Sequence, residues 1–222
     1  MSLYVYAVLR GTAAGENGPP ADSVSIVQCG GIEAAVRPTT DAPAVDAEGL
    51  RAHDAVVRRL HAQAAAVLPM RFGAMVRDEA ALRSWVDTAR PILDQGLDLV
   101  AGREQMAIRI YGEVAEATAE DRHDVEQRGT RYLMTRRAAS MPPELVPAME
   151  TLRARLSPLI HSERVERHAT PPLIVTVRHL VARGAGDAYR AAIEGDLPGF
   201  ERLTRQVSGP WPPYAFTPEE LS

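Results

Sequence analysis

The 222-residue sequence contains no lysine, so all 25 of its basic residues are arginines. Without lysine, the chain cannot form a Schiff base through a side-chain amine, and it cannot contain a phosphate-binding loop that ends in Lys-Ser or Lys-Thr. The 29 acidic residues leave a formal net charge of −4, which argues against general affinity for nucleic acid. Composition alone therefore excludes two kinds of chemistry and disfavours one class of partner.

Cysteine is nearly absent as well, since Cys29 is the only one. It cannot form a disulfide within the chain, which fits a reducing cytoplasm. The opening residues, MSLYVYAVLRG, have no basic segment ahead of their apolar run, and no run approaches the length of a membrane span. We therefore expect a soluble, cytoplasmic protein that does not enter a membrane.

Motifs for catalysis and metal binding are missing too. His53 and His61 are eight residues apart on one predicted helix, whereas a catalytic zinc site needs three ligands that converge on one point. His179 lies within a predicted strand, where a hydrogen-bonded core histidine is the simpler interpretation. The segment GTAAGENG lacks the G-x-G-x-x-G pattern, and no G-x-S-x-G signature occurs. We therefore expect no catalytic residue, no cofactor and no bound metal.

The first half of the chain alternates strand and helix patterns. Residues 3–9 (LYVYAVL) are apolar on both faces, which predicts a central strand. After a predicted loop at 11–23, two short apolar runs around Gly30-Gly31 predict a β-hairpin. A helix is predicted over 48–66 from apolar residues on one face, namely Leu50, Val56, Val57, Leu60, Ala64 and Val67.

A second helix is predicted over 78–100, with Pro91 as a kink or a break. In the second half, strands are predicted from alternating or continuous apolar runs at 103–111, 173–181 and 201–209. Helices are predicted at 119–139, 142–159 and 187–195, the middle one starting at Pro142-Pro143 with Pro158 as a kink.

Hairpins among the alternating elements favour two α+β units over one doubly wound sheet. We place the boundary near Gly102, which follows the second helix. The predicted domains are 1–102 and 103–217, the second including the proline- and aromatic-rich segment, followed by a tail at 218–222.

A charged residue is embedded in the apolar segment LPMRFGAM, between residues 67 and 76, where a short strand or strand-like turn is predicted. Burying a guanidinium without a partner is costly, so we expect Arg71 to meet an acid or carbonyl groups. Pro69 and Gly73 predict a defined bend on either side of it. A structural ion pair and a binding role both remain open for Arg71.

The segment SGPWPPYAF, residues 208–216, concentrates prolines and aromatic residues near the end of a chain that is only 5% aromatic. Gly209 is predicted to adopt positive φ and to end the preceding strand. The prolines favour an extended, rigid backbone that projects Trp211, Tyr214 and Phe216 as anchors. These rings either pack against the chain's own core or present a surface to a partner.

These segments together resemble the gas vesicle protein L/F family (GvpL/GvpF) over nearly the whole chain. The matching stretches are the opening strand LYVYAVLRG, the hairpin strand IEAAVRP, the helix pattern L-x-x-H-D-x-V-V-x-x-L from Leu50 to Leu60 leading into VLPMRFGAMV, the strand GREQMAIRIYG, the segment GTRYLMTRR and the ending VSGPWPPYAF. The last of these is the most specific, because such a proline-aromatic string is rare.

The resemblance implies an accessory protein for gas vesicle assembly rather than an enzyme. It implies a ferredoxin-like N-terminal α+β unit and a helix-rich C-terminal α+β unit. The implied partners are the hydrophobic vesicle shell protein and other vesicle accessory proteins, in the cytoplasm or on the vesicle, and self-association is compatible with this role. The candidates for partner contact are Arg71, Phe72, Trp211, Pro212, Pro213, Tyr214 and Phe216.

Two other interpretations stay open, a ligand-sensing ferredoxin-like module and an enzyme. An open polar pocket around Arg71 or His53 would favour either of them. A filled core with an exposed apolar patch would favour the assembly role. The contact surface for a shell protein could be a sheet edge, a helix groove or the C-terminal segment.

Overall fold

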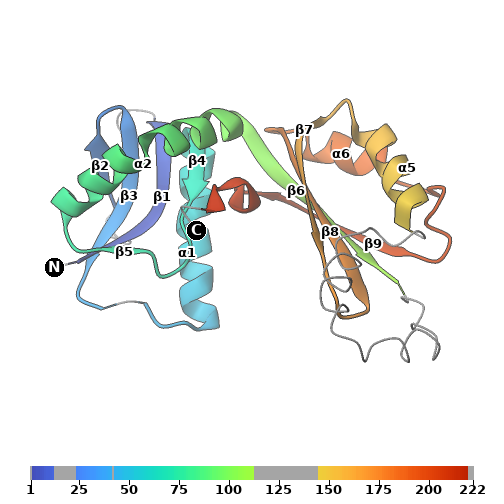
Figure 1. The fold of residues 1–222 in the computed structure, drawn as a ribbon, viewed down its shortest axis with the longest axis horizontal. Coiled ribbons are helices and arrows are strands. Elements are labelled where there is room, and N and C mark those ends of the chain that lie inside the picture. The colour runs from blue at the N-terminus through green and yellow to red at the C-terminus, as the bar shows by residue number, and fades with distance from the viewer. Residues whose placement is uncertain (1, 13–23, 42, 113–144, 220–222) are drawn as a thin grey trace, which may run out of the picture. The chain divides into compact units, whose positions relative to one another are not determined.

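A computed structural model of the chain describes residues 2–12, 24–41, 43–112 and 145–219 (Figure 1). The described part has helices and two sheets, as expected for an α+β protein. The predicted helix at 119–139, the helix start at Pro142-Pro143 and most of the predicted loop at 11–23 lie outside the described residues.

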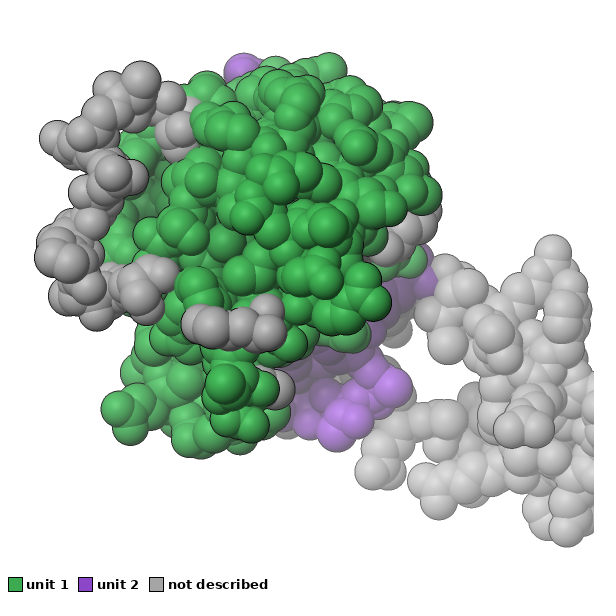
Figure 2. Space-filling view, turned by 90° about the vertical axis from the view of Figure 1, so that its left-hand side faces the viewer, with its two compact units in different colours: residues 1–105, 180–183, 210–222 green, residues 106–179, 184–209 purple. Residues whose placement is uncertain are grey.

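The chain divides into two compact units (Figure 2). Unit 1 consists of Met1–Gln105, Leu180–Arg183 and Pro210–Ser222, and unit 2 consists of Met106–His179 and Gly184–Gly209. The C-terminal segment thus belongs with the N-terminal residues. Compactness does not reveal which segments fold alone, so the domain boundaries at residues 102 and 217 stay predictions.

Unit 1 is built on a five-stranded sheet with β1 (Ser2–Thr12) in the middle, as the apolar pattern of residues 3–9 predicts. The strand order is β2-β3-β1-β4, and β5 also pairs with β1. Strand β1 extends to Thr12, beyond the predicted start of the loop, because Thr12 pairs with Ala64. The other strands are β2 (Ser25–Cys29), β3 (Ile32–Thr39), β4 (Ala64–Pro69) and β5 (Met75–Val76).

A β-bulge in β1 decides which side chains share a face. The register with β3 shifts between Val5 and Ala7, so Tyr6 and Ala7 both face the core that contains Val56 and Val57 of α1. Tyr4 lies on this face as well. Tyr4 and Tyr6 share the face by ordinary strand alternation, and the bulge adds Ala7 and Leu9 to it.

Helices α1 (Ala47–Gln63) and α2 (Glu79–Val100) both begin at an aspartate whose side chain accepts a backbone N–H, as an N-cap does. Helix α1 ends three residues before the predicted end, because Ala64 and Ala66 pair with β1 instead. Helix α2 runs through Pro91 as one helix, so the predicted break is wrong. Pro91 is exposed, so its ring meets solvent instead of the core.

The sheet of unit 1 has a core on each face. Residues of α1 pack on one face, and those of α2 pack on the other. Most of the predicted apolar face of α1 is buried, but Leu50 is 48% exposed. It lies in the first turn, ahead of the buried run that starts at His53. The prediction that Leu50 faces the core is therefore wrong.

The second sheet has the order β7-β8-β6-β9. Its edge strand β7 was not expected, because the mostly polar IHSERVER has no strong apolar alternation. Strand β9 passes through Gly209, whose φ is 116°, so the expected positive φ is confirmed but the expected strand end is wrong. An edge strand tolerates Pro210. The strands are β6 (Arg103–Tyr111), β7 (Ile160–Arg167), β8 (Leu173–Ala182) and β9 (Thr204–Trp211).

Helices α5 (Val146–Leu156) and α6 (Gly186–Ala192) accompany this sheet. Helix α5 ends before Pro158, so that proline does not kink it as predicted. A short 3-10 turn, η4 (Tyr214–Phe216), follows β9.

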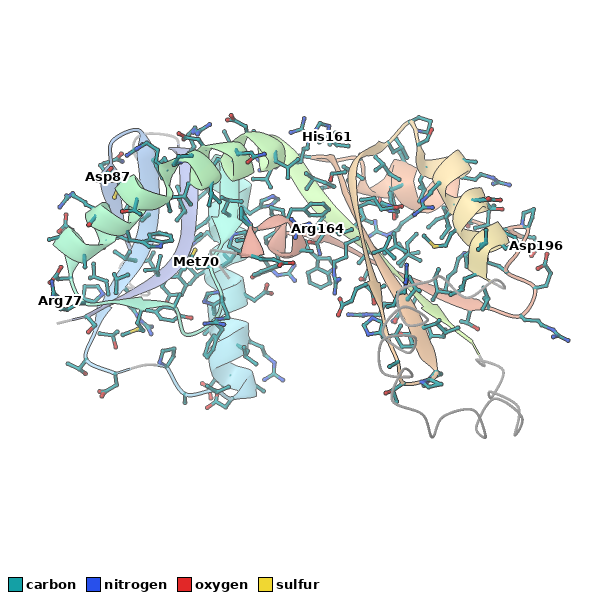
Figure 3. All side chains as sticks on the ribbon, viewed as in Figure 1. Met70, Arg77, Asp87, His161, Arg164 and Asp196 are labelled. Carbon is teal, nitrogen blue, oxygen red and sulfur yellow. The ribbon has the colours of Figure 1, made fainter. Side chains whose placement is uncertain are left out.

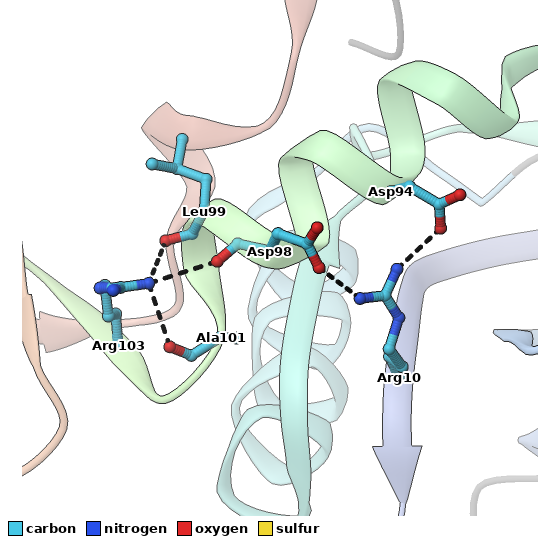
Figure 4. Close-up of polar contacts among 6 residues, drawn as sticks. All are labelled: Arg10, Asp94, Asp98, Leu99, Ala101 and Arg103. Carbon is cyan, nitrogen blue, oxygen red and sulfur yellow. Dashed lines mark hydrogen bonds and ion pairs between the residues drawn. The ribbon is translucent and has the colours of Figure 1, made fainter.

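Arginines hold the C-terminal end of α2 in place (Figure 4). Arg103 donates to the Leu99 carbonyl at 2.8 Å and to the Asp98 and Ala101 carbonyls at 3.3 Å, which satisfies groups that a helix end leaves unpaired. Arg10 of β1 bonds Asp94 at 2.7 Å and Asp98 at 2.5 Å. The guanidinium suits this task because it carries several donors in a fixed geometry.

Candidate functional site

The C-terminal segment docks onto unit 1. The Phe216 ring is fully buried in the core that α2 covers. Thr217 donates through Oγ1 to the Pro69 carbonyl at 3.1 Å, and the Ala215 N–H donates to Oε1 of Gln105 at 2.8 Å. Gly96 of α2 leaves room for the segment, since a Cβ there would lie 3.3 Å from Pro218.

The other two aromatic anchors of the segment lie against α1. The Tyr214 hydroxyl donates to Oδ1 of Asp54 at 2.9 Å. The Arg58 guanidinium lies 4.2 Å from the centroid of the Trp211 ring, a cation–π contact, and bonds Asp54 at 2.5 Å. The sequence left open whether these rings pack against the chain itself or face a partner. In the structure, this segment packs against the chain itself.

Arg71 and Phe72 lie in the turn after β4. Met70 is buried (Figure 3), but Arg71 is exposed. The chain reverses here, since the Ala74 N–H bonds the Arg71 carbonyl at 3.1 Å and Gly73 has φ 88°. The expected burial of Arg71 is therefore wrong, because neighbours in a turn do not share one environment. The predicted bend at Gly73 is confirmed.

Phe72 forms one wall of a pocket of about 290 Å³ in unit 1. It is the only one of the seven candidate contact residues that lines this pocket. The two motif segments therefore do not combine into one site. The lining residues come from β1, β3, the start of α1 and the turn after β4, and they are Tyr4, Tyr6, Arg37, Pro43, Ala44, Asp46, Glu48, Gly49, Ala52, His53 and Phe72.

An aromatic cluster centred on His53 forms the inner side of the pocket. The His53 ring stacks on Tyr6 with centroids 5.4 Å apart and meets Phe72 edge-on at 5.7 Å. Its Nδ1 lies 2.6 Å from the Tyr4 hydroxyl. The Gly73 N–H donates to that hydroxyl, at 3.4 Å, and the hydroxyl keeps a proton that it can donate to Nδ1.

The His53 side chain is buried, with 6% of the residue's surface exposed, and its Nε2 has no hydrogen-bond partner among the described residues. Burial lowers the pKa of His53, against smaller opposite effects of the Met70 backbone and Asp54. The ring is therefore neutral at pH 7. The only sequence signal for this burial is the place of His53 in the helix pattern of residues 50–60, three residues from both Leu50 and Val56.

The remaining walls of the pocket carry charge. The Arg37 guanidinium lies 5.9 Å from the ring centroids of both Tyr4 and Tyr6. Asp46 and Glu48 also line the pocket; Asp46 caps α1 by accepting the Gly49 N–H at 2.8 Å, and Glu48 follows in the first turn. The pocket thus combines an aromatic floor with one cation and two carboxylates.

Unit 2 has its own buried polar cluster, around His179. Nδ1 of His179 lies 2.6 Å from the Tyr189 hydroxyl, and Nε2 lies 3.0 Å from Oε2 of Glu163. Arg153 bonds the other oxygen of Glu163 at 2.7 Å. Burial lowers the pKa of His179. This cluster links α5, β7, β8 and α6, and it fits the hydrogen-bonded core histidine that the strand position predicts.

Within the residues that the structure describes, no group of three or more His, Cys, Asp or Glu side chains converges as a metal site would require. None of the helices within those ranges has both the length and the apolar character needed to cross a bilayer.

Comparison with known proteins gives one consistent result. The chain is 29% identical over 183 residues to gas vesicle protein F2 of Halobacterium salinarum, covering 80% of this chain and 71% of that protein. It is 27% identical over 180 residues to gas vesicle protein F1 of the same organism, covering 80% and 72%.

Two crystal structures share the fold. GvpF of Anabaena sp. PCC7120 has a TM-score of 0.68 at 16% identity and covers 98% of this chain and 96% of its own. GvpF of Microcystis aeruginosa has a TM-score of 0.69 at 14% identity and covers 98% and 99%. The profile of the gas vesicle synthesis protein GvpL/GvpF family matches residues 2–218. The chain is therefore a member of the GvpL/GvpF family.

Proposed function

We propose that this protein takes part in gas vesicle formation as a non-catalytic accessory protein that binds the hydrophobic shell protein. The observation that carries the proposal is the family match, which spans residues 2–218 and so includes both compact units. Relatives named gas vesicle proteins F1 and F2 support the same role.

The proposed binding has a physical purpose. A hydrophobic shell protein exposes strands or an amphipathic helix before it assembles, and a partner that covers them prevents aggregation. We assign direct contact to the candidate residues with exposed surface, Arg71, Phe72, Trp211 and Tyr214. Pro212, Pro213 and Phe216 are buried, so in this proposal they hold the contact residues in position.

Co-expression with the shell protein from the same genome tests this role. Affinity capture of the tagged chain, followed by sedimentation of the captured material, should recover a soluble complex of both proteins. An unrelated hydrophobic protein of similar size serves as the control and should not be recovered. If the shell protein aggregates to the same extent with and without the chain, the proposed binding is wrong.

The pocket beside Phe72 and His53 favours a second candidate, a small-molecule sensor on a ferredoxin-like N-terminal unit. A thermal-shift screen of the purified chain against common metabolites tests it. A saturable rise in melting temperature that disappears when the pocket is blocked would support sensing. Melting curves unaffected by every compound would leave the assembly role as the better explanation.

A further inference from the structure

We propose that the pocket beside Phe72 receives one large apolar side chain of the shell protein, and that an acidic residue next to it in the partner chain pairs with Arg37. This inference rests on the function proposed above and adds the place and the chemistry of the contact. Four properties of the pocket support it, namely its volume, its rim, its charge and its packing.

The volume fits a side chain. Pockets that enclose small molecules occupy about 300–1,000 Å³, and this one, at about 290 Å³, lies at the lower limit. The floor is formed by Tyr4, Tyr6, His53 and Phe72, which make it largely aromatic. Protein interfaces often place an aromatic or aliphatic anchor in a cavity of this kind.

The rim indicates a chain segment rather than a free small molecule. Among the described residues, the two most exposed large apolar side chains are Val45, at 86%, and Leu50, at 48%. Each is the sequence neighbour of a pocket residue, Val45 of Ala44 and Leu50 of Gly49. A small molecule confined to the pocket would leave both exposed, whereas a polypeptide crossing the pocket would cover them.

The charges orient the partner. Arg37 rests over two tyrosine rings, and no ion pair to it forms within the described part of the chain. Its guanidinium can therefore bind a carboxylate through two hydrogen bonds. Asp46 and Glu48 line the same pocket and repel a carboxylate. An acidic residue of the partner therefore binds most favourably at Arg37, away from these two carboxylates.

The aromatic part of the pocket is already packed before any partner binds. The Tyr4 hydroxyl and His53 are joined at 2.6 Å, and Tyr4 and Tyr6 pack edge to face with centroids 4.7 Å apart. Gly49 is enclosed as well, since a Cβ there would lie 2.7 Å from the Ala44 carbonyl oxygen and 3.3 Å from Phe72. Walls that are already packed lose little conformational freedom on binding, which favours affinity.

Two arginine substitutions on α1 test the pocket directly. Ala52 is exposed and lines the pocket, so Ala52→Arg should fill the entrance while leaving the core untouched. Ala62 is exposed on the same helix, about 15 Å away at a rise of about 1.5 Å per residue, so Ala62→Arg is the matched control. We expect Ala52→Arg to bind the co-expressed shell protein at least about tenfold more weakly than Ala62→Arg, with both melting as the unmodified chain does.

Arg37 tests the charged half of the proposal. Arg37→Glu should reduce capture of the shell protein by a similar factor, and Arg37→Lys should retain part of it because the charge remains. If the unmodified chain captures no shell protein, the proposed function itself fails. If it captures the protein and Ala52→Arg captures it equally well, the pocket is not the contact and this inference is overturned. Equal capture by Arg37→Glu would overturn the pairing with an acidic residue.

Discussion

The phenylalanines at positions 72 and 216 have different tasks although both belong to conspicuous motifs. Phe216 is completely buried and anchors the end of the chain to unit 1. Phe72 is half-buried in a turn and forms a pocket wall. A ring in a filled core contributes to stability, whereas a ring beside a cavity remains available to a partner.

Loss of the Phe216 ring should therefore destabilise unit 1. Phe216→Ala is expected to cost about 3–5 kcal/mol, the usual range for removing a buried phenylalanine ring. Tyr214→Phe removes one exposed hydrogen bond to Asp54 and should cost at most about 1.5 kcal/mol. Both tryptophans of the chain, Trp85 and Trp211, lie in unit 1, so urea unfolding followed by tryptophan fluorescence reports on this unit. Equal midpoints for the two variants would mean that the C-terminal segment is not anchored by Phe216.

The burial or exposure of individual side chains was the property that the sequence predicted least well. Arg71 was expected to be embedded among apolar residues beside an acid or carbonyl groups and is exposed, and Leu50 was expected in the core and is half-exposed. Both residues have apolar neighbours in the sequence but not an apolar environment in the fold. The chain reverses at Arg71, and Leu50 lies in the first turn of α1, ahead of the residues that reach the core. The pocket could not be predicted either, because its walls meet only when β1, β3 and α1 pack together.

Elements with strong periodicity were predicted well. The central strand β1, α2 and β8 carry long apolar patterns, the hairpin carries a glycine pair at its turn, and all four occur close to the expected positions. The break at Pro91 and the kink at Pro158 do not occur, because Pro91 is tolerated on the exposed side of α2 and Pro158 lies past the end of α5. Edge strand β7 was missed because only its tertiary partner β8 makes it a strand.

Four elements of unit 2 depend on a single pH-sensitive cluster. Burial lowers the pKa of His179. Burial also acts to raise the pKa of Glu163, but hydrogen bonds from Arg153 and His179 outweigh it and leave that pKa below its ordinary value. The folded cluster thus holds a neutral histidine beside an ionised carboxylate.

Acidification should weaken this cluster. Well above a pH of about 6.5, His179 is neutral in both the folded and the unfolded chain, so its contribution to stability does not change with pH. As the pH falls below that value, the unfolded chain takes up a proton that the folded chain resists, so the free energy of unfolding decreases. Glu163 adds a loss in the same direction only below pH about 4.3, its ordinary value.

Thermal melts followed by circular dichroism between pH 8 and pH 5 measure the effect. The melting temperature should fall below pH 6.5, and His179→Gln should flatten part of that fall, although it lowers stability at pH 8. His161→Gln, at an exposed position on the neighbouring strand, is the control and should keep the original slope. An unchanged slope in His179→Gln would show that His179 does not carry the pH dependence.

At the scale of the whole molecule, the proposed function rests on the resemblance to a family and not on the chemistry of a site. The aromatic ending and the helix-to-turn motif identify the family, and the match over residues 2–218 confirms it. From composition and residue patterns alone, lysine-based chemistry could be excluded and the α+β class could be predicted. A binding partner could not be predicted in this way, because binding surfaces are assembled from segments that are distant in the sequence.

The central proposal is that this chain takes part in gas vesicle formation. The most direct measurement is pressure-sensitive light scattering of cells that express the vesicle gene set of the same genome with and without this gene. We predict that scattering which collapses under pressure disappears without the gene and returns with the unmodified chain supplied separately, but returns only weakly with Ala52→Arg. Full collapsible scattering in cells that lack the gene would contradict the account.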